Sequence, residues 1–214
     1  MQTVALIDYG SGNLRSAEKA LLKAASGLSR EMTIAVTHDP AVIAAADRVV
    51  LPGVGAFAAC MGRLKSYDGL IGALTEAVRG RAVPFLGVCV GMQLLATRGL
   101  EFGETPGLGW ISGDVRKIEP KDPALKVPHM GWNSLDGTSD QALFAGLPDG
   151  SHMYFTHSFA LYAEDAADVA AWTTHGEPLC AAVTRGNVAG SQFHPEKSQA
   201  SGQRFLANFL EWAP

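Results

Sequence analysis

Short apolar runs alternate with helical stretches throughout the first half of the chain, and this alternation restricts the fold more than any other feature. The runs are continuously apolar, namely TVALIDY, MTIAVT, RVVLPG and AVPFLGV at residues 3–9, 32–37, 48–53 and 82–88. Strands of this kind occur in parallel sheets that helices cover on both faces. We therefore predict an α/β fold with an open, mostly parallel central sheet.

Segments with helical spacing lie between and after these runs. Apolar residues recur at intervals of three and four over residues 14–28, and residues 56–78 suit one or two helices, with residues 67–69 as a candidate break. The stretch GMQLLATR (91–98) predicts the start of another helix. Residues 199–212 carry Phe and Leu at helical spacing and predict a closing helix.

The second half of the chain has a different pattern. Its segments are short, rich in β-branched and aromatic residues, and separated by Pro, Gly and Asp. They predict added antiparallel or mixed strands at GDVRKI, HMYFTHSFAL, DVAAWTTH, LCAAVTRG and NVAGSQF. Without an internal repeat or a flexible linker, we expect a single α/β domain over residues 1–214.

Charge and cysteine content narrow the functional classes. The net charge of −4 gives no general attraction to nucleic acid or to anionic membranes. No apolar run reaches the length that spans a bilayer, and the N-terminus lacks the basic region of a signal peptide. Cys60, Cys89 and Cys180 show no metal-ligand spacing, which favours a reducing cytoplasm over a disulfide framework.

The segment GVCVG places Cys89 between two glycines at the end of a predicted strand. A strand followed by G-x-C-x-G and a helix is the thiol form of the nucleophile elbow, which exposes a reactive group above a sheet. The free amides and positive end of the following helix favour a thiolate. This pattern alone supports a nucleophile and a buried core thiol about equally. Cys60 and Cys180 lack such a setting and are expected to be buried structural thiols.

A histidine and a carboxylate follow the last predicted strand in the segment SQFHPEKSQ. Pro195 restricts the preceding residue toward extended geometry, and residues two apart in an extended segment point to the same side. Glu196 can therefore hold one imidazole nitrogen of His194 while the other faces the sulfur. A polar turn before the final helix is the alternative, and it would be preferred without the cysteine motif.

The loop LPGVGAF, residues 51–57, ends the third predicted strand with two glycines and no charge. Such a loop can present backbone N–H groups to a developing oxyanion, with the amide of Val90 as a second donor. A structural Gly-Pro turn is an equal alternative. A phosphate-binding loop is less favoured, because no Lys-Ser/Thr pair follows.

In this order and spacing, LPGVGAF, GVCVGMQLL and HPEKS resemble the class I, triad-type glutamine amidotransferases. The resemblance extends from IDYGSGN to the last helix, and it implies that family's flavodoxin-like fold. The segments DYGSGNLRS, VPHMGWN and YFTHSFA are similar to the glutaminase subunits of imidazole glycerol phosphate synthases, which act in histidine biosynthesis. VPHMGWN discriminates best among amidotransferase subunits.

The resemblance implies a role for each member of the triad. Cys89 attacks the γ-carboxamide of L-glutamine, His194 protonates the leaving ammonia and later activates water, and Glu196 orients His194. Oxyanion N–H groups come from Val54 and Val90, with a peptide rearrangement around Gly53 as an option.

The resemblance also assigns residues to glutamine binding. The positions that match glutamine contacts are Gly55, Gln93, Glu101, Ser158 and Phe159. A carboxylate suits the α-ammonium group, so Glu101 is favoured for that contact. Neither a cofactor nor a metal is implied.

A partner is implied as well: a (β/α)₈-barrel cyclase subunit that forms a heterodimer with the glutaminase and consumes its ammonia. This chain lacks the repeats and the length of such a barrel. The candidates for the docking face, or for coupling across it, are Asn13, Trp132, Asn133 and Lys197. An ordinary core position is the alternative for Trp132.

Three other functions are weighed against this one. The first is the glutaminase subunit of another synthase, such as anthranilate or pyridoxal phosphate synthase, with the same chemistry and a different acceptor. The second is a cysteine peptidase or chaperone-like protein with a similar elbow, which the His-Pro-Glu segment disfavours. The third is a non-enzymatic binding module, which the presence of all three triad residues disfavours.

Overall fold

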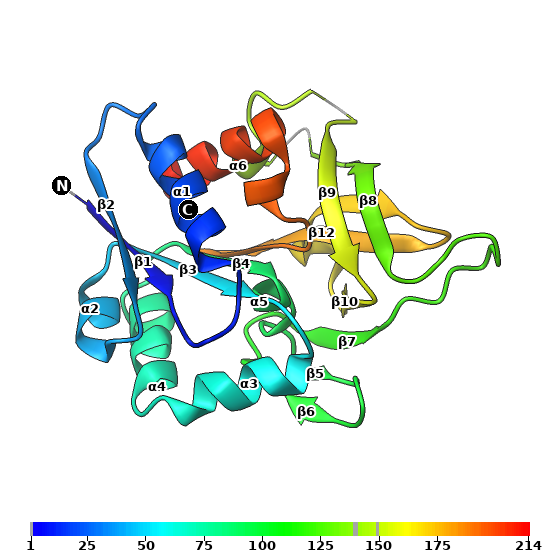
Figure 1. Cartoon of the computed structure of the whole chain (residues 1–214), viewed down its shortest axis with the longest axis horizontal. Coiled ribbons are helices and arrows are strands. Elements are labelled where there is room, and N and C mark those ends of the chain that lie inside the picture. The colour runs from blue at the N-terminus through cyan, green and yellow to red at the C-terminus, as the bar shows by residue number, and fades with distance from the viewer. Residues whose placement is uncertain (1, 139–140, 149) are drawn as a thin grey trace.

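A seven-stranded, mostly parallel sheet forms the centre of the molecule (Figure 1). The computed structural model describes residues 2–138, 141–148 and 150–214. The strand order is β11-β12-β13-β4-β3-β1-β2, and all pairings from β13 to β2 are parallel. The strands of this sheet are β1 (Gln2–Ile7), β2 (Met32–Thr37), β3 (Arg48–Gly53), β4 (Phe85–Cys89), β11 (Val169–Thr174), β12 (Pro178–Arg185) and β13 (Val188–Ser191).

Helices cover both faces of this sheet, as the continuous apolar runs predict. In Figure 1, α1 and α6 lie together on one face, and α2, α3 and α4 lie on the other. The helices are α1 (Leu14–Ala25), α2 (Pro40–Ala45), α3 (Phe57–Ser66), α4 (Leu70–Thr75), α5 (Val90–Gln93) and α6 (Gln199–Glu211). Every residue of β3 and β4 is buried, so these two strands lie at the core.

Two smaller sheets lie beside the central one, and together with the antiparallel strands β11 and β12 of the central sheet they confirm the added antiparallel and mixed strands. One has the order β10-β7-β5-β6, and the other pairs β8 with β9. Their strands are β5 (Arg98–Gly99), β6 (Thr105–Pro106), β7 (Gly113–Lys117), β8 (His129–Ser134), β9 (His152–His157) and β10 (Phe159–Ala163). The apolar segment 152–161 divides at Ser158 into two strands that belong to different sheets.

The predicted helix after Cys89 is present but short. Only α5 forms, and it ends at Gln93. The carbonyls of Leu94, Leu95 and Ala96, which a longer helix would use, accept hydrogen bonds from the amides of residues 108–111 instead. In contrast, the break between α3 and α4 is confirmed, because Gly69 adopts a left-handed conformation there.

Two glycines allow β3, β4 and α5 to approach more closely than side chains permit. A Cβ atom on Gly91 would lie 1.9 Å from the Leu51 carbonyl oxygen of β3. A Cβ atom on Gly87 would lie 2.4 Å from the Gly91 carbonyl oxygen. The turn after β4 is therefore compatible only with glycine at both positions.

None of the helices in the described ranges combines the length and apolar character needed to cross a membrane.

Substituting Gly91 tests the close approach of α5 to β3. We expect Gly91→Ala to lower the free energy of unfolding by about 3 kcal/mol, because the new methyl group overlaps a backbone oxygen that cannot move alone. Gly62→Ala is the matched control, since Gly62 is an exposed residue of α3 and a Cβ atom added there would have no heavy atom within 4 Å. That control should be neutral or stabilising by up to about 1 kcal/mol. Equal urea midpoints for the two variants would contradict the steric account.

Candidate active site

Three adjacent parallel strands bring the candidate catalytic residues to one edge of the central sheet. The strands β3, β4 and β13 are neighbours, with Gly53 paired to Cys89 and Ser191 paired to Val88. His194 follows three residues after the end of β13. The carboxyl ends of parallel strands in open α/β sheets are where ligands bind. Residues 53, 89 and 194, distant in sequence, therefore meet at one such edge.

Cys89 occupies a strained turn. Its backbone has φ 55° and ψ −111°, a conformation that non-glycine residues rarely adopt. Such strain costs about 1–3 kcal/mol, and it persists where the surrounding structure fixes it, typically at functional sites. Here the tight packing of Gly87 and Gly91 fixes it. The side chain is 4% exposed and lines a cavity, so the thiol is reachable from that side alone.

His194 is held by a carboxylate and by the backbone of its neighbours. Its Nδ1 lies 2.8 Å from Glu196 Oε1. The predicted contact is therefore present, and His194 has the extended backbone expected before a proline. The extended segment does not continue to Glu196, however, because Pro195–Lys197 forms a 3₁₀ turn. The His194 amide donates to the Tyr154 carbonyl, and its carbonyl accepts from the Ser198 hydroxyl at 2.6 Å. The two backbone hydrogen bonds fix the position of His194 in the chain, and the Glu196 contact fixes its ring.

The surroundings of His194 favour its protonated form. Burial lowers its pKa, but the neighbouring Cys89 and the hydrogen bond and charge of Glu196 outweigh burial and raise the pKa to about 9. No described side chain completes a hydrogen bond to Nε2, so this nitrogen is left for the sulfur and for substrate. An imidazolium beside a cysteine stabilises the thiolate, which is the nucleophilic form.

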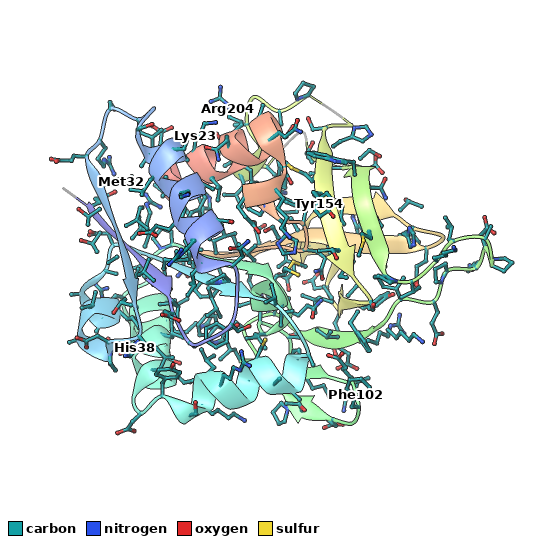
Figure 2. All side chains as sticks on the ribbon, in the orientation of Figure 1. Lys23, Met32, His38, Phe102, Tyr154 and Arg204 are labelled. Carbon is teal, nitrogen blue, oxygen red and sulfur yellow. The ribbon has the colours of Figure 1, made fainter. Side chains whose placement is uncertain are left out.

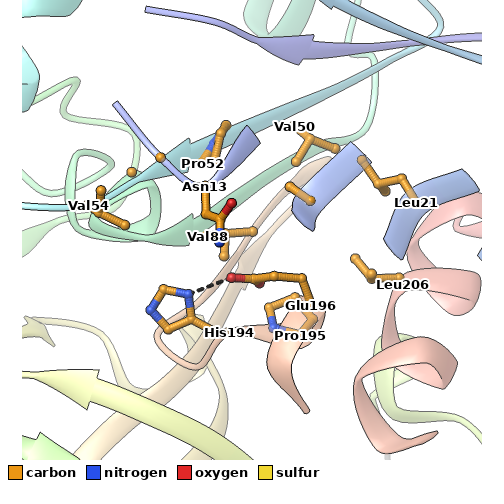
Figure 3. Close-up of a pocket in the computed structure, with 13 residues that line it drawn as sticks. Asn13, Leu21, Val50, Pro52, Val54, Val88, His194, Pro195, Glu196 and Leu206 are labelled. Carbon is orange, nitrogen blue, oxygen red and sulfur yellow. Dashed lines mark hydrogen bonds and ion pairs between the residues drawn. The ribbon is translucent and has the colours of Figure 1, made fainter. Parts of the chain in front are cut away.

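A small apolar cavity lies behind the imidazole and the carboxylate (Figure 3). Its volume is about 20 Å³, room for about one water molecule. Val50, Val88 and Leu206 line it beside Glu196, whose side chain is 7% exposed. Such a lining keeps bulk water from the His194–Glu196 contact and strengthens it.

A larger cavity of about 560 Å³ is also lined by His194. Cys89 and His194 both border it. All five candidate glutamine-binding residues line it as well, namely Gly55, Gln93, Glu101, Ser158 and Phe159. Its size and its few polar groups suit a small polar ligand.

Glu101, Gln93 and Phe159 already have hydrogen-bond partners within the protein. Glu101 Oε2 accepts a hydrogen bond of 2.8 Å from the Phe57 amide at the start of α3. The Phe159 carbonyl accepts from Gln93 Nε2 at 2.8 Å. The Glu101 carboxylate therefore both caps a helix and borders the cavity.

The candidate oxyanion donors differ in availability. Val90 is the first residue of α5, where helix geometry leaves amides unpaired. The Val54 amide instead donates to the Ser11 hydroxyl at 3.2 Å, and the same hydroxyl donates to the Val54 carbonyl at 2.8 Å. Gly53 packs against the Gly91 nitrogen, which a Cβ atom would approach to 2.7 Å. In this conformation Val54 does not offer its N–H to the cavity.

The four candidate interface residues divide into two kinds. Asn13, Trp132 and Lys197 are exposed, and Trp132, at 46% exposure, is not a core residue. Asn133 turns inward, because its Nδ2 contacts His129 Nε2 at 3.1 Å and the Thr174 carbonyl at 2.8 Å. It therefore suits coupling through the protein better than direct contact with a partner.

Metal ligation finds no support in the part of the chain that the structure describes. Groups of three or more His, Cys, Asp or Glu side chains arranged to hold an ion are absent there. Cys60 and Cys180 are both buried and unpaired as thiols, as expected.

Known proteins share this architecture and sequence. Residues 5–212 match the family described as glutamine amidotransferase class-I. The chain belongs to the class-I glutamine amidotransferases. Imidazole glycerol phosphate synthase subunit HisH of Caulobacter vibrioides is 62% identical over 100% of both chains, and its Rhodospirillum rubrum counterpart is 58% identical over 99% of both. A solved glutamine amidotransferase has a TM-score of 0.69 at 20% identity, covering 97% of each chain, and supports the fold.

Within this amidotransferase framework, several residues around the site were missed by the sequence analysis. Ser11 contacts the Val54 peptide, and Gln192 Nε2 lies 3.7 Å from Cys89 Sγ. His157 borders the cavity and bonds to the Phe159 carbonyl at 2.9 Å. Gln192 precedes His194 by two residues, a spacing that indicates the same side of an extended segment.

The raised pKa of His194 can be measured directly. We expect its imidazole to titrate near pH 9 in the folded protein and at lower pH in Cys89→Ala, because Cys89 is the largest of the groups that raise the pKa. The folded pKa exceeds the unfolded value of about 6.5, so protonation stabilises the fold. That contribution is complete below about pH 6.5 and is lost as pH rises through about 9.

Imidazole NMR resonances provide the measurement, with His194→Gln identifying the signal. Cys180→Ala is the control, since that buried cysteine is not among the groups that shift the pKa of His194. The same midpoint in wild type and Cys89→Ala would contradict the assigned cause.

Proposed function

We propose that this chain is the glutaminase subunit of imidazole glycerol phosphate synthase, and that it hydrolyses L-glutamine to glutamate and ammonia. The observation that carries the proposal is that Cys89 and His194 border one cavity, with the sulfur on a strained elbow and the imidazole paired to the Glu196 carboxylate. The full-length identity of 62% to the Caulobacter vibrioides subunit supports this specific synthase.

The chemistry follows from the protonation states. The Cys89 thiolate attacks the γ-carbonyl carbon of glutamine, and backbone N–H groups stabilise the resulting oxyanion. The His194 imidazolium gives its proton to the departing nitrogen, so that ammonia leaves and a thioester remains. Neutral His194 then takes a proton from water, and the hydroxide releases glutamate and restores the thiolate. Glu196 keeps Nδ1 bonded throughout.

The ammonia requires a second active site, because free ammonia becomes non-nucleophilic ammonium in water. We propose that a (β/α)₈-barrel cyclase subunit docks over the mouth of the 560 Å³ cavity as a heterodimer and forms imidazole glycerol phosphate and an aminoimidazole carboxamide ribonucleotide. Exposed apolar side chains near this mouth support a docking face. Phe102, which lines the cavity, is 95% exposed on the turn between β5 and β6 (Figure 2), and Met130 and Trp132 are exposed along β8.

We also propose that the chain stays in a low-activity state until the partner binds. The support is the Ser11 hydroxyl, which binds both the amide and the carbonyl of Val54 and keeps that N–H away from the cavity. Loss of one oxyanion donor costs roughly 10²–10³ in rate. Release of the Val54 peptide from Ser11 would therefore activate hydrolysis.

A second synthase is the alternative assignment within the same chemistry. Anthranilate and pyridoxal phosphate synthases also take ammonia from such subunits. Pull-down with each candidate synthase subunit, followed by a glutaminase assay, separates the assignments. Stimulation by another synthase subunit and not by the cyclase would contradict the one proposed.

Removing the thiol tests the nucleophile. With the cyclase bound, we expect Cys89→Ala to reduce glutamine-dependent synthesis by at least 10³-fold, because no other group can form the thioester. Synthesis from added ammonium salts should stay at the wild-type rate, since the second site is untouched. The control is Cys180→Ala, a buried thiol on β12, which should retain glutamine-dependent turnover. Survival of that turnover in Cys89→Ala would refute the role of Cys89.

Removing the Ser11 hydroxyl tests the proposed restraint. We expect Ser11→Ala to raise glutamine hydrolysis by the isolated chain about fivefold, the population shift that corresponds to about 1 kcal/mol for one net hydrogen bond. Ser26→Ala is the matched control, because its hydroxyl bonds to Lys23 at the end of α1. A steady-state assay at saturating glutamine gives the rates. An unchanged or lower rate in Ser11→Ala would show that Ser11 does not restrain Val54.

A further inference from the structure

A fully buried amide side chain contacts the reacting sulfur. Gln192 has no exposed surface and carries no charge. Its Nε2 lies 3.7 Å from Cys89 Sγ, within reach of a sulfur acceptor, and its Oε1 accepts from Gln93 Nε2 at 2.9 Å. Both ends of this amide are therefore engaged, one with the sulfur and one with a neighbouring amide. A buried amide is retained at such a position only when its partners satisfy it.

The direction of this contact is set by a backbone carbonyl. A carbonyl oxygen can only accept, so the Phe159 oxygen requires the nitrogen of Gln93 to face it, at 2.8 Å. The second hydrogen on that nitrogen then requires the oxygen of Gln192 to face Gln93. The nitrogen of Gln192 is left facing the sulfur. Reversing either amide would place two acceptors or two donors against each other.

Two neutral histidines, His157 and His129, form a hydrogen-bonded series that also ends at the Phe159 carbonyl. His157 Nδ1 donates to the Phe159 oxygen at 2.9 Å, so its Nε2 must accept from His129 Nδ1, also at 2.9 Å. Burial lowers the pKa of His157 to about 3 and that of His129 to about 4, so both rings stay neutral at physiological pH. Asn133 closes the chain by donating to His129 and to the Thr174 carbonyl.

We propose that Gln192 is a dedicated hydrogen-bond donor to the Cys89 sulfur, oriented through Gln93 by the Phe159 carbonyl. The inference rests on the proposed role of Cys89 as nucleophile. A charge-assisted N–H bond stabilises the thiolate and fixes its direction toward the cavity. It acts together with the positive charge of His194, which Cys89 and Glu196 stabilise. The polarity of the network keeps the donor end of the Gln192 amide on the sulfur.

Alkylation of Cys89 by iodoacetamide tests this donor without glutamine or a partner. The tryptic peptide 82–98 contains Cys89 as its sole cysteine, so mass spectrometry reports the modification of that thiol. At pH 7 we expect Gln192→Met and Gln192→Glu to slow alkylation roughly tenfold, because one thiolate-stabilising bond is lost. A loosened pocket would expose the thiol and accelerate alkylation, so the sign separates lost donation from lost packing.

Two further variants complete the design. Gln93→Met should slow alkylation to a smaller extent, because Gln192 then keeps its nitrogen but loses the group that orients it. Gln203→Met on α6 is the matched control and should react at the wild-type rate, with equal thermal unfolding as the check on folding. A wild-type or faster alkylation rate in folded Gln192→Met would overturn the proposal. Retained glutamine-dependent synthesis in Cys89→Ala would instead refute the underlying function, so the two failures are distinct.

Discussion

The close approach of β3, β4 and the start of α5 is the constraint on which the rest of the site depends. Gly91 lets the turn after β4 pass against the Leu51 carbonyl, and Gly87 lets the same turn fold back on itself. Because the chain cannot relax there, Cys89 is held at a positive φ that it would not adopt alone. Close packing of the backbone therefore sets the position of the sulfur, independently of the hydrogen bonds made to it.

The histidines near that sulfur differ in protonation state, and their neighbours decide which state each one adopts. His194 holds a proton at neutral pH, because Cys89 and Glu196 raise its pKa despite burial. His129 and His157 lie in the same region but remain neutral, because burial without a carboxylate lowers their pKa values. The same side chain is therefore charged at one position and neutral at two others, according to its neighbours.

The sequence predicts the central sheet and the turn at Cys89, because both depend on local pattern. Continuous apolar runs define β1 to β4, and G-x-C-x-G defines the elbow. The length of α5 was not predictable, since amides from residues 108–111 terminate it and no local signal reports them. Likewise no strand was predicted over residues 129–134, where β8 forms by pairing with β9.

The polar residues around the site could not be predicted for a related reason: their hydrogen-bond partners lie far away along the chain. Gln192 meets Gln93 across 99 residues, and Ser11 meets Val54 across 43. Spacing alone places Gln192 on the side of His194, but its hydrogen-bond direction depends on the Phe159 carbonyl. A backbone carbonyl carries no residue-type signal, although it decides the orientation of two amides and two imidazoles. The polarity of a buried network is therefore a property of the fold that composition and motif do not encode.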